Sequence, residues 1–334
     1  MAKINPSSSL PPIKVLFTDS WTMFKGSLLH VFLLNLIGFG IFASLFIIAL
    51  IIAIPLGIMS VLAVIQPNGF NPLAIFSFGA LGILILFLII VCAIVGLAIQ
   101  TATILIVSNY KKDLALSQTL KRGFHLVLPL LGASFLTGLI TTGGFFLLLI
   151  PGIVLSVLFS FTAYEIVISE NSVLGAIRRS IMIVKSNFWG ILGRMLLWAF
   201  IVIVVVNIPN FFNALGKNYN ASVGLIGFVL QILVSWFGIS YSVTLYKQAQ
   251  VGAQDGSGKL MFPIILSIVG WVVGLVMFIS LAALIIFAIS NLMQNSKNTL
   301  NPYFKVPNRN NMKNVVPLSP TATSTPTLPP RIRY

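Results

Sequence analysis

Long apolar runs separated by short polar stretches dominate the pattern along the chain. An apolar run of about 20 residues is long enough to cross the hydrocarbon core of a bilayer as a helix. Seven runs reach or approach that length, at about residues 27–58, 74–108, 126–142, 145–168, 188–208, 223–246 and 261–291. The pattern therefore predicts an all-α fold, a polytopic transmembrane helical bundle of about six core spans plus one.

Some of these runs do not fit a straight helix across a bilayer. The first two exceed 30 residues, so their helices must tilt, kink or project from the membrane, and Pro55 is a plausible kink or end point. The third and fourth runs are almost continuous, which predicts a hairpin. Two glycine-containing stretches interrupt them, "TTGG" at 141–144 and "IPG" at 150–152, and either could form the turn.

A basic, amphipathic stretch precedes a pair of apolar runs three times. The stretches are "FTDSWTMFKGSLLHVFLL" at 17–34, "TLKRGFHLVLPLLG" at 119–132 and "AIRRSIMIVKSNFWGILG" at 176–193. Ser20 and Lys25 of the first stretch align with Ser180 and Lys185 of the third. We therefore predict three repeats of one unit, an interfacial amphipathic helix followed by a transmembrane hairpin.

The repeats suggest how the chain is divided. We expect an N-terminal cytoplasmic segment at 1–26 that contains an amphipathic helix at 13–25. A six-helix membrane core follows at 27–250, with an additional transmembrane helix at 261–291. Residues 292–334 form a basic tail that includes "PLSPTATSTPTLPP", and this Pro/Thr-rich composition predicts disorder.

Composition and charge narrow the class of protein. Of the 334 residues, 58% are hydrophobic and only 7% are charged, whereas soluble domains carry about 25% charged residues. Lipid must therefore surround most of the chain. The net charge of +15 comes from cations scattered between apolar runs, without a basic stripe on a soluble domain, so we expect no nucleic-acid partner.

The cations also predict topology. With the N-terminus inside, the inside segments hold twelve cations and the outside loops hold only Lys217. This bias predicts a membrane protein with a cytoplasmic N-terminus. The C-terminal tail does not fit this bias, because seven spans would place its six cations outside. The side of the membrane on which the tail lies is left undecided. The twelve are Lys3, Lys14, Lys25, Lys111, Lys112, Lys121, Arg122, Arg178, Arg179, Lys185, Lys247 and Lys259.

Some of these cations belong to the amphipathic stretches. In the third stretch, Ile177, Ile181 and Val184 share one helical face, and we expect this helix to lie flat on the membrane with that face down. The cations beside such faces are then candidates for contact with anionic lipid headgroups, the predicted partners. These candidates are Lys25, Lys121, Arg122, Arg178, Arg179 and Lys185. Arg194, one turn inside the fifth run, is expected to reach back toward the inner interface.

Few residues are suited to chemistry. Glu165, near the inner end of the fourth run, is the candidate intramembrane functional residue, although it could instead pair with a nearby arginine at the interface. Neither histidine has a second ligand at metal-binding spacing. We predict no enzyme activity, no metal and no cofactor. Several polar side chains in apolar runs could bond between helices or line a substrate path: Asn35, Gln100, Thr101, Thr103 and Gln231.

One stretch carries a family resemblance. Residues 145–196, "FFLLLIPGIVLSVLFSFTAYEIVISENSVLGAIRRSIMIVKSNFWGILGRML", contain an "IPG" turn, an acidic residue before an "S-x-x-x-A-hydrophobic-R-R-S" helix, and a lysine before "FW". The stretch resembles the membrane domain associated with glycerophosphodiester phosphodiesterases, and also related multi-pass bacterial membrane proteins. The resemblance covers about residues 12–250 and implies a fold and a location in the bacterial cytoplasmic membrane.

The same resemblance does not imply phosphodiesterase activity. The enzymes of that name carry a separate soluble catalytic barrel, for which this chain has no room. We therefore expect a non-enzymatic membrane protein that acts as a scaffold or anchor. The alternative is a transporter or lipid-handling protein, because repeated hairpins and surface helices could shape a lipid-accessible cavity. Oligomeric state and protein partners stay open.

Overall fold

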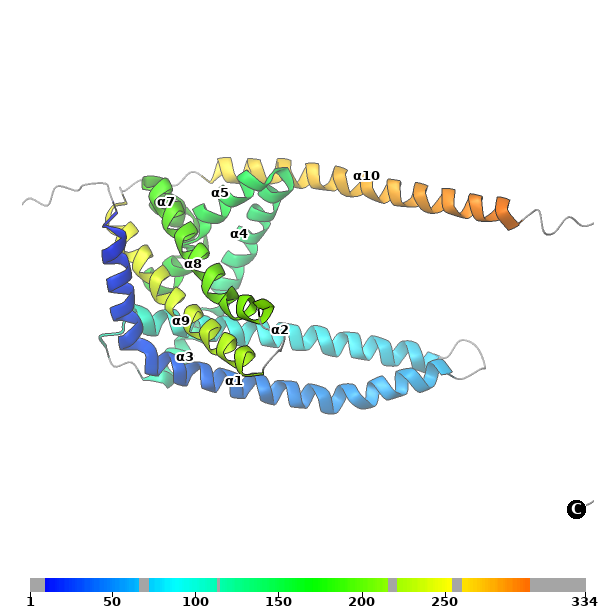
Figure 1. Ribbon diagram of the computed structural model, residues 1–334, viewed down its shortest axis with the longest axis horizontal. Helices are drawn as coiled ribbons and strands as arrows, with labels where there is room; N and C mark the ends of the chain where they lie inside the picture. The colour runs from blue at the N-terminus through cyan, green and yellow to red at the C-terminus, as the bar shows by residue number, and fades with distance from the viewer. Residues whose placement is uncertain (1–9, 66–71, 113–114, 216–220, 254–259, 301–334) are drawn as a thin grey trace, which may run out of the picture. The chain divides into compact units, whose positions relative to one another are not determined.

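The computed structural model describes residues 10–65, 72–112, 115–215, 221–253 and 260–300. Within these ranges all regular structure is α-helical, and seven stretches are long and apolar enough to span a membrane. The predicted all-α, polytopic fold is thereby confirmed (Figure 1). The helices are α1 (Ile13–Ile65), α2 (Pro72–Ser108), α3 (Leu116–His125), α4 (Val127–Leu147), α5 (Leu149–Phe159), α6 (Thr162–Ser169), α7 (Val173–Ser186), α8 (Phe188–Leu215), α9 (Ala221–Val251) and α10 (Met261–Leu300).

The order of the helices follows the predicted three-fold pattern. The first copy consists of α1 and α2, the second of α3 to α6, and the third of α7 to α9. In each copy the two spans pack along one another, α1 on α2, α4 on α5, and α8 on α9. Each of these pairs is therefore a helical hairpin.

The first helix differs from the expectation. The predicted amphipathic segment at 13–25 does not end at residue 26, because α1 continues as one helix to Ile65 and contains Pro55. Its first part, dark blue in Figure 1, runs across the direction of the remainder. Gly26 and Ser27 follow the segment, and the Ser27 hydroxyl donates to the carbonyl of Met23 at 2.8 Å. Such Gly/Ser pairs bend a helix without ending it.

The turn between α4 and α5 is a single residue and lies at neither of the two glycine-containing stretches. Only Leu148 leaves the helical conformation, with φ −169° and ψ 160°. Gly144 and Gly152 instead pack the two helices together, since a Cβ on Gly144 would lie 3.2 Å from the Gly152 Cα. Pro151 lies in the first turn of α5, where a proline is tolerated. Both glycine-containing stretches are thus parts of helices.

The fourth apolar run is broken near its middle. α5 ends at Phe159 and α6 begins at Thr162, which frees backbone groups inside the apolar core. The buried Ser180 hydroxyl of α7 serves both sides of the break. It donates to the carbonyl of Leu158 at 2.8 Å and accepts from the amide of Phe161 at 3.2 Å.

The position of α7 corrects the prediction that its apolar face meets lipid. Ile177, Ile181 and Val184 are buried in a cluster with side chains of α1, α5, α6 and α9, such as Phe161 and Tyr246. This side of α7 packs on the protein core, and the buried Ser180 on the same side also bonds to the break between α5 and α6. The cations lie off this face, as the pattern predicted.

The start of α10 packs on the second copy. Up to Leu275 the chain belongs to one compact unit, and from Val276 it forms a second. Within the first unit Gly270 lies against the backbone of Gly143. The Trp271 indole donates to the carbonyl of Leu139 at 3.0 Å. Gly270 therefore allows close backbone contact between α10 and α4 within the chain.

Candidate functional site

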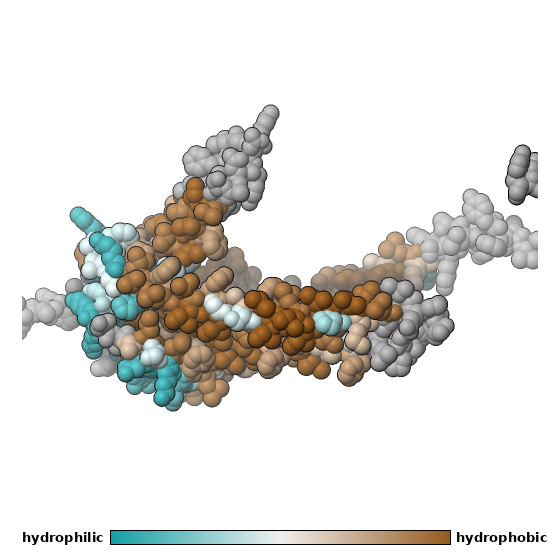
Figure 2. Space-filling view, turned by 90° about the horizontal axis from the view of Figure 1, so that it is seen from below, coloured by the Kyte–Doolittle hydropathy of each residue, from teal (hydrophilic) through white to brown (hydrophobic). Residues whose placement is uncertain are grey.

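Most of the polar side chains on the face shown in Figure 2 gather at one end, and the coloured atoms on the rest of that face are mainly apolar. Among the predicted headgroup-contacting cations, Arg179 is half-buried and has an interaction partner. The other five have exposed side chains, and they are Lys25, Lys121, Arg122, Arg178 and Lys185. Exposure is what a headgroup contact requires, and it does not test whether lipid binds there.

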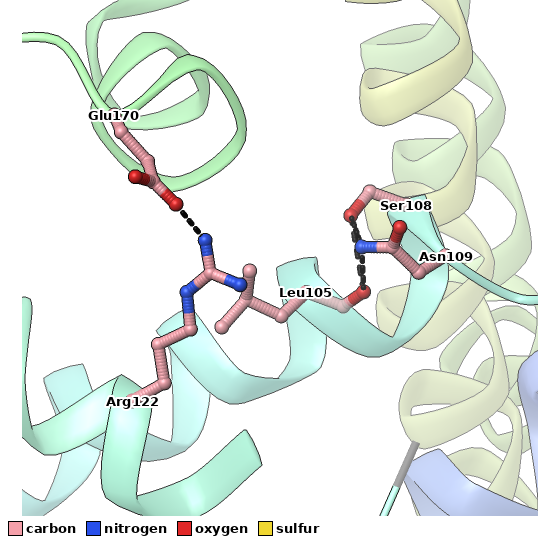
Figure 3. Close-up of polar contacts among 5 residues, drawn as sticks. All are labelled: Leu105, Ser108, Asn109, Arg122 and Glu170. Carbon is pink, nitrogen blue, oxygen red and sulfur yellow. Dashed lines mark hydrogen bonds and ion pairs between the residues drawn. The ribbon is translucent and has the colours of Figure 1, made fainter. Parts of the chain in front are cut away.

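Arg122 connects the second copy to the start of the third. It lies on α3 and forms an ion pair with Glu170, in the turn between α6 and α7 (Figure 3). Glu170 has a left-handed backbone, with φ 55°, which ends α6. Ser172 then caps α7 by accepting from the amide of Gly175. Both charged side chains are more than half exposed, so the pair is open to competition from other ions.

One pocket lies between the end of α2 and α3, with a volume of about 230 Å³. Two cations line it, and none of the lining residues carries a carboxylate. Asn109 is fixed in its wall by hydrogen bonds of 3.1 Å to Leu105 and Ser108, as Figure 3 shows. The pocket therefore favours an anion. Its lining is Leu105, Asn109, Lys112, Gln118, Thr119 and Arg122.

A second pocket, of about 560 Å³, also has Arg122 in its wall. Its lining is half polar and half apolar: Arg122, His125, Glu170, Asn171 and Ser172 with Leu126, Pro129, Ile166 and Val173. Such a mixture suits a molecule with a charged head and an apolar body. Because Arg122 lines both pockets, its guanidinium is the centre of this candidate site.

Glu165 lies outside these pockets. Its side chain is fully buried on α6, and its two carboxylate oxygens accept hydrogen bonds from Asn171 at 2.6 Å and from Tyr246 of α9 at 3.0 Å. The Tyr246 hydroxyl also lies 2.8 Å from that of Ser169. These bonds connect α6, the turn after it and α9. A functional role for Glu165 stays a prediction.

The Arg194 side chain reaches back along α8 toward the start of that helix, and its contact with the inner interface stays a prediction. Its guanidinium donates to the carbonyl of Gly190 and to that of Pro11, just before α1. The side chain is only 8% exposed. It therefore connects the beginning of the first copy to the third.

A third cavity lies at the level of the membrane spans. It has a volume of about 620 Å³ and is formed by α1, α2 and α9. It brings together Asn35, Gln100 and Thr103 from the predicted set of polar side chains, and adds Ser235. Gln231 and Thr101 do not line it.

Sequence reasoning missed the partners of the predicted residues. Asn109 and Lys112 lie only 10 to 13 residues before Arg122 in the chain, so the sequence could have indicated that they share a pocket with it. Tyr246 lies 81 residues from Glu165, and nothing in the sequence connects them. In the described part of the chain no three His, Cys, Asp or Glu side chains form a group suited to a metal.

Comparisons with known proteins agree with a membrane protein. No family model matches the chain, and no solved structure matches it significantly. The chain is similar to a UPF0259 membrane protein of Buchnera aphidicola subsp. Baizongia pistaciae (strain Bp), with 33% identity over 110 residues. The match covers 33% of this chain and 44% of that relative. It supports a distant homology to a bacterial membrane protein, and it does not show the resemblance to the phosphodiesterase-associated domain.

Proposed function

We propose that this protein is a non-enzymatic, lipid-handling membrane protein that binds anionic phospholipids at the two pockets beside Arg122. The observation that carries the proposal is the position of Arg122, which lines an anion-favouring pocket on one side and a half-apolar pocket on the other. A phospholipid presents the same two features, a phosphate and an acyl chain, a short distance apart.

The chemistry of Arg122 supports a phosphate ligand. A guanidinium presents several N–H donors in a planar fork that matches phosphate oxygens. Glu170 now occupies that fork with a carboxylate. Because the pair is exposed and a surface ion pair contributes little free energy, a lipid phosphate can compete with Glu170 for it.

The expected topology suits this role. The positive-inside pattern predicts that the pockets face the cytoplasmic leaflet, whose anionic lipids attract clustered cations. The resemblance to the phosphodiesterase-associated membrane domain is compatible with lipid handling and implies no catalysis here. An anchoring role for a protein partner stays a prediction, since no described feature specifies such a partner.

The test compares lipid retention by four forms of the full chain in nanodiscs of phosphatidylcholine and phosphatidylglycerol. They are wild type, Arg122→Gln, Glu170→Gln and the control Lys14→Gln, which removes an exposed cation that lies outside both pockets and is not a predicted headgroup contact. After detergent washing, mass spectrometry measures the phosphatidylglycerol that stays bound. We expect Arg122→Gln to lower retention about tenfold, because a charge-assisted hydrogen bond is lost. Lys14→Gln should change the retention little.

Glu170→Gln separates a binding role of Arg122 from a structural one. This variant removes the competing carboxylate and keeps the guanidinium, so retention should stay equal or rise. Retention that falls equally in Arg122→Gln and Glu170→Gln would mean that the ion pair only holds the fold. Equal effects of Arg122→Gln and Lys14→Gln would mean that only the general surface charge attracts lipid.

A further inference from the structure

The cavity between α1, α2 and α9 differs in kind from the two pockets beside Arg122. All its lining residues lie within candidate membrane spans, and none of them is charged. Phe39 is 71% exposed, so the cavity opens at the surface of the protein where lipid is expected. Its volume of about 620 Å³ is within the range of small-molecule sites.

Several side chains that line the cavity can accept hydrogen bonds from a ligand, because their own donor groups are already used. The Asn35 amide donates to the carbonyl of Val31 at 2.8 Å, which leaves its oxygen as an acceptor. The hydroxyls of Thr103 and Ser235 donate to carbonyls of their own helices at 2.8 Å. Their oxygens are then acceptors as well.

The cavity also contains donors without partners. Neither the Gln100 amide nor the Trp236 indole forms a side-chain hydrogen bond with any residue in the described ranges. Polar groups at membrane depth are costly when they are left unsatisfied, because hydrocarbon supplies no hydrogen bonds. A ligand that both donates and accepts would satisfy Gln100 and the acceptors beside it.

We propose that this cavity binds an uncharged lipid with a hydroxyl headgroup, of the diacylglycerol class. The hydroxyl donates to the amide oxygen of Asn35 or Gln100 and accepts from the Gln100 amide. Aromatic side chains such as Phe39, Phe42 and Trp236 pack against the acyl chain. A phospholipid headgroup does not suit the site, because no cation lines the cavity to pair with a phosphate.

The test uses the full chain in phosphatidylcholine nanodiscs that contain dioleoylglycerol. The dioleoylglycerol retained after detergent washing is measured by mass spectrometry. Gln100→Leu keeps the size of the side chain and removes its hydrogen bonds, so we expect about tenfold lower retention. The matched control is Gln231→Leu, the same change in another span at a residue outside the cavity, which should retain wild-type levels.

A second variant tests the cavity without touching a polar group. A Cβ on Gly96 would face Phe42 at 3.9 Å, so Gly96→Leu places a side chain in the cavity and should also displace dioleoylglycerol. Wild-type retention in both Gln100→Leu and Gly96→Leu would overturn the proposal, and so would displacement of dioleoylglycerol by phosphatidylglycerol in the wild type.

The two lipid sites share no lining residue, so their tests are independent. Arg122→Gln should leave dioleoylglycerol retention unchanged, and Gln100→Leu should leave phosphatidylglycerol retention unchanged. Loss of dioleoylglycerol in Arg122→Gln would contradict a separate cavity site.

Discussion

The carboxylate of Glu165 lies where neither water nor lipid reaches it, and Asn171 and Tyr246 supply its hydrogen bonds. A buried carboxylate is tolerated only while such donors stay in place, because its desolvation is not otherwise offset. Removing one donor therefore costs more than the net contribution of one hydrogen bond. The network explains how an acidic residue is kept inside an apolar bundle.

This argument predicts the effect of Tyr246→Phe. The change removes the hydroxyl that donates to Glu165 and keeps the ring, so we expect a loss of about 1–2 kcal/mol in the free energy of unfolding. Thermal unfolding of the detergent-solubilised protein measures it as a lower midpoint temperature.

The control is Tyr110→Phe, since the Tyr110 hydroxyl forms no hydrogen bond with the described residues. Equal midpoints for Tyr110→Phe and Tyr246→Phe would show that the bond to Glu165 contributes nothing to stability.

For single residues, sequence patterns predicted which side chains are exposed better than they predicted which side chains pair with one another. The cations were expected off the apolar face of α7, and Arg178 and Lys185 are indeed exposed, because the period of a helix fixes which side chains share a face. The partner of Arg122 could not be predicted, since Glu170 is reached only after α4, α5 and α6 have folded back.

Among the elements, the hairpin of α4 and α5 depends most on small residues. Its single non-helical residue, Leu148, leaves no loop to hold the helices apart. Close packing at Gly144 and Gly152 is therefore required directly beside the turn.

Gly144→Leu should disrupt this hairpin. A Cβ at this position would already lie 2.6 Å from Leu155, and a whole leucine forces the helices apart at a cost of about 3 kcal/mol or more. Gly138→Leu in the same helix is the matched control, since a Cβ there meets nothing within 4 Å. Size-exclusion chromatography and thermal unfolding should show a misfolded or destabilised Gly144→Leu and a normal Gly138→Leu. A stable Gly144→Leu would refute the packing argument.

The sequence predicted the number and order of the spans well, because their long apolar runs require burial in lipid. The limits of the helices were predicted less well. α1 passes residue 26 without ending, and the fourth run is broken between Phe159 and Thr162. The break depends on a contact with a distant residue, Ser180 of α7, which local composition does not contain.

For the whole molecule, the feature that bears on topology is that polar side chains gather at one end of the face in Figure 2. Lys25, Lys121 and Lys185 come from three different copies and are all exposed. If each copy crosses the membrane twice, these three positions lie on one side of it.

Cysteine labelling in intact cells tests this arrangement. Cys92 is the single cysteine of the chain and is first replaced by alanine. In this background, single cysteines at positions 25, 121 and 185 should react with an impermeant maleimide only after the cells are made permeable. This result follows if all three positions face the cytoplasm, as the positive-inside pattern predicts. Labelling of one position from outside would contradict the parallel order of the copies.

The hairpin in every copy has a consequence for how such a chain could grow. A unit with an even number of spans returns the chain to the side from which it started. Tandem duplication of the corresponding gene segment then adds a copy without inverting those that follow, and each new copy keeps its cations on the favoured side. Duplication of a unit with an odd number of spans would give inverted copies, as in transporters with inverted repeats. An ancestor with one hairpin could thus have been extended stepwise, each intermediate being correctly inserted.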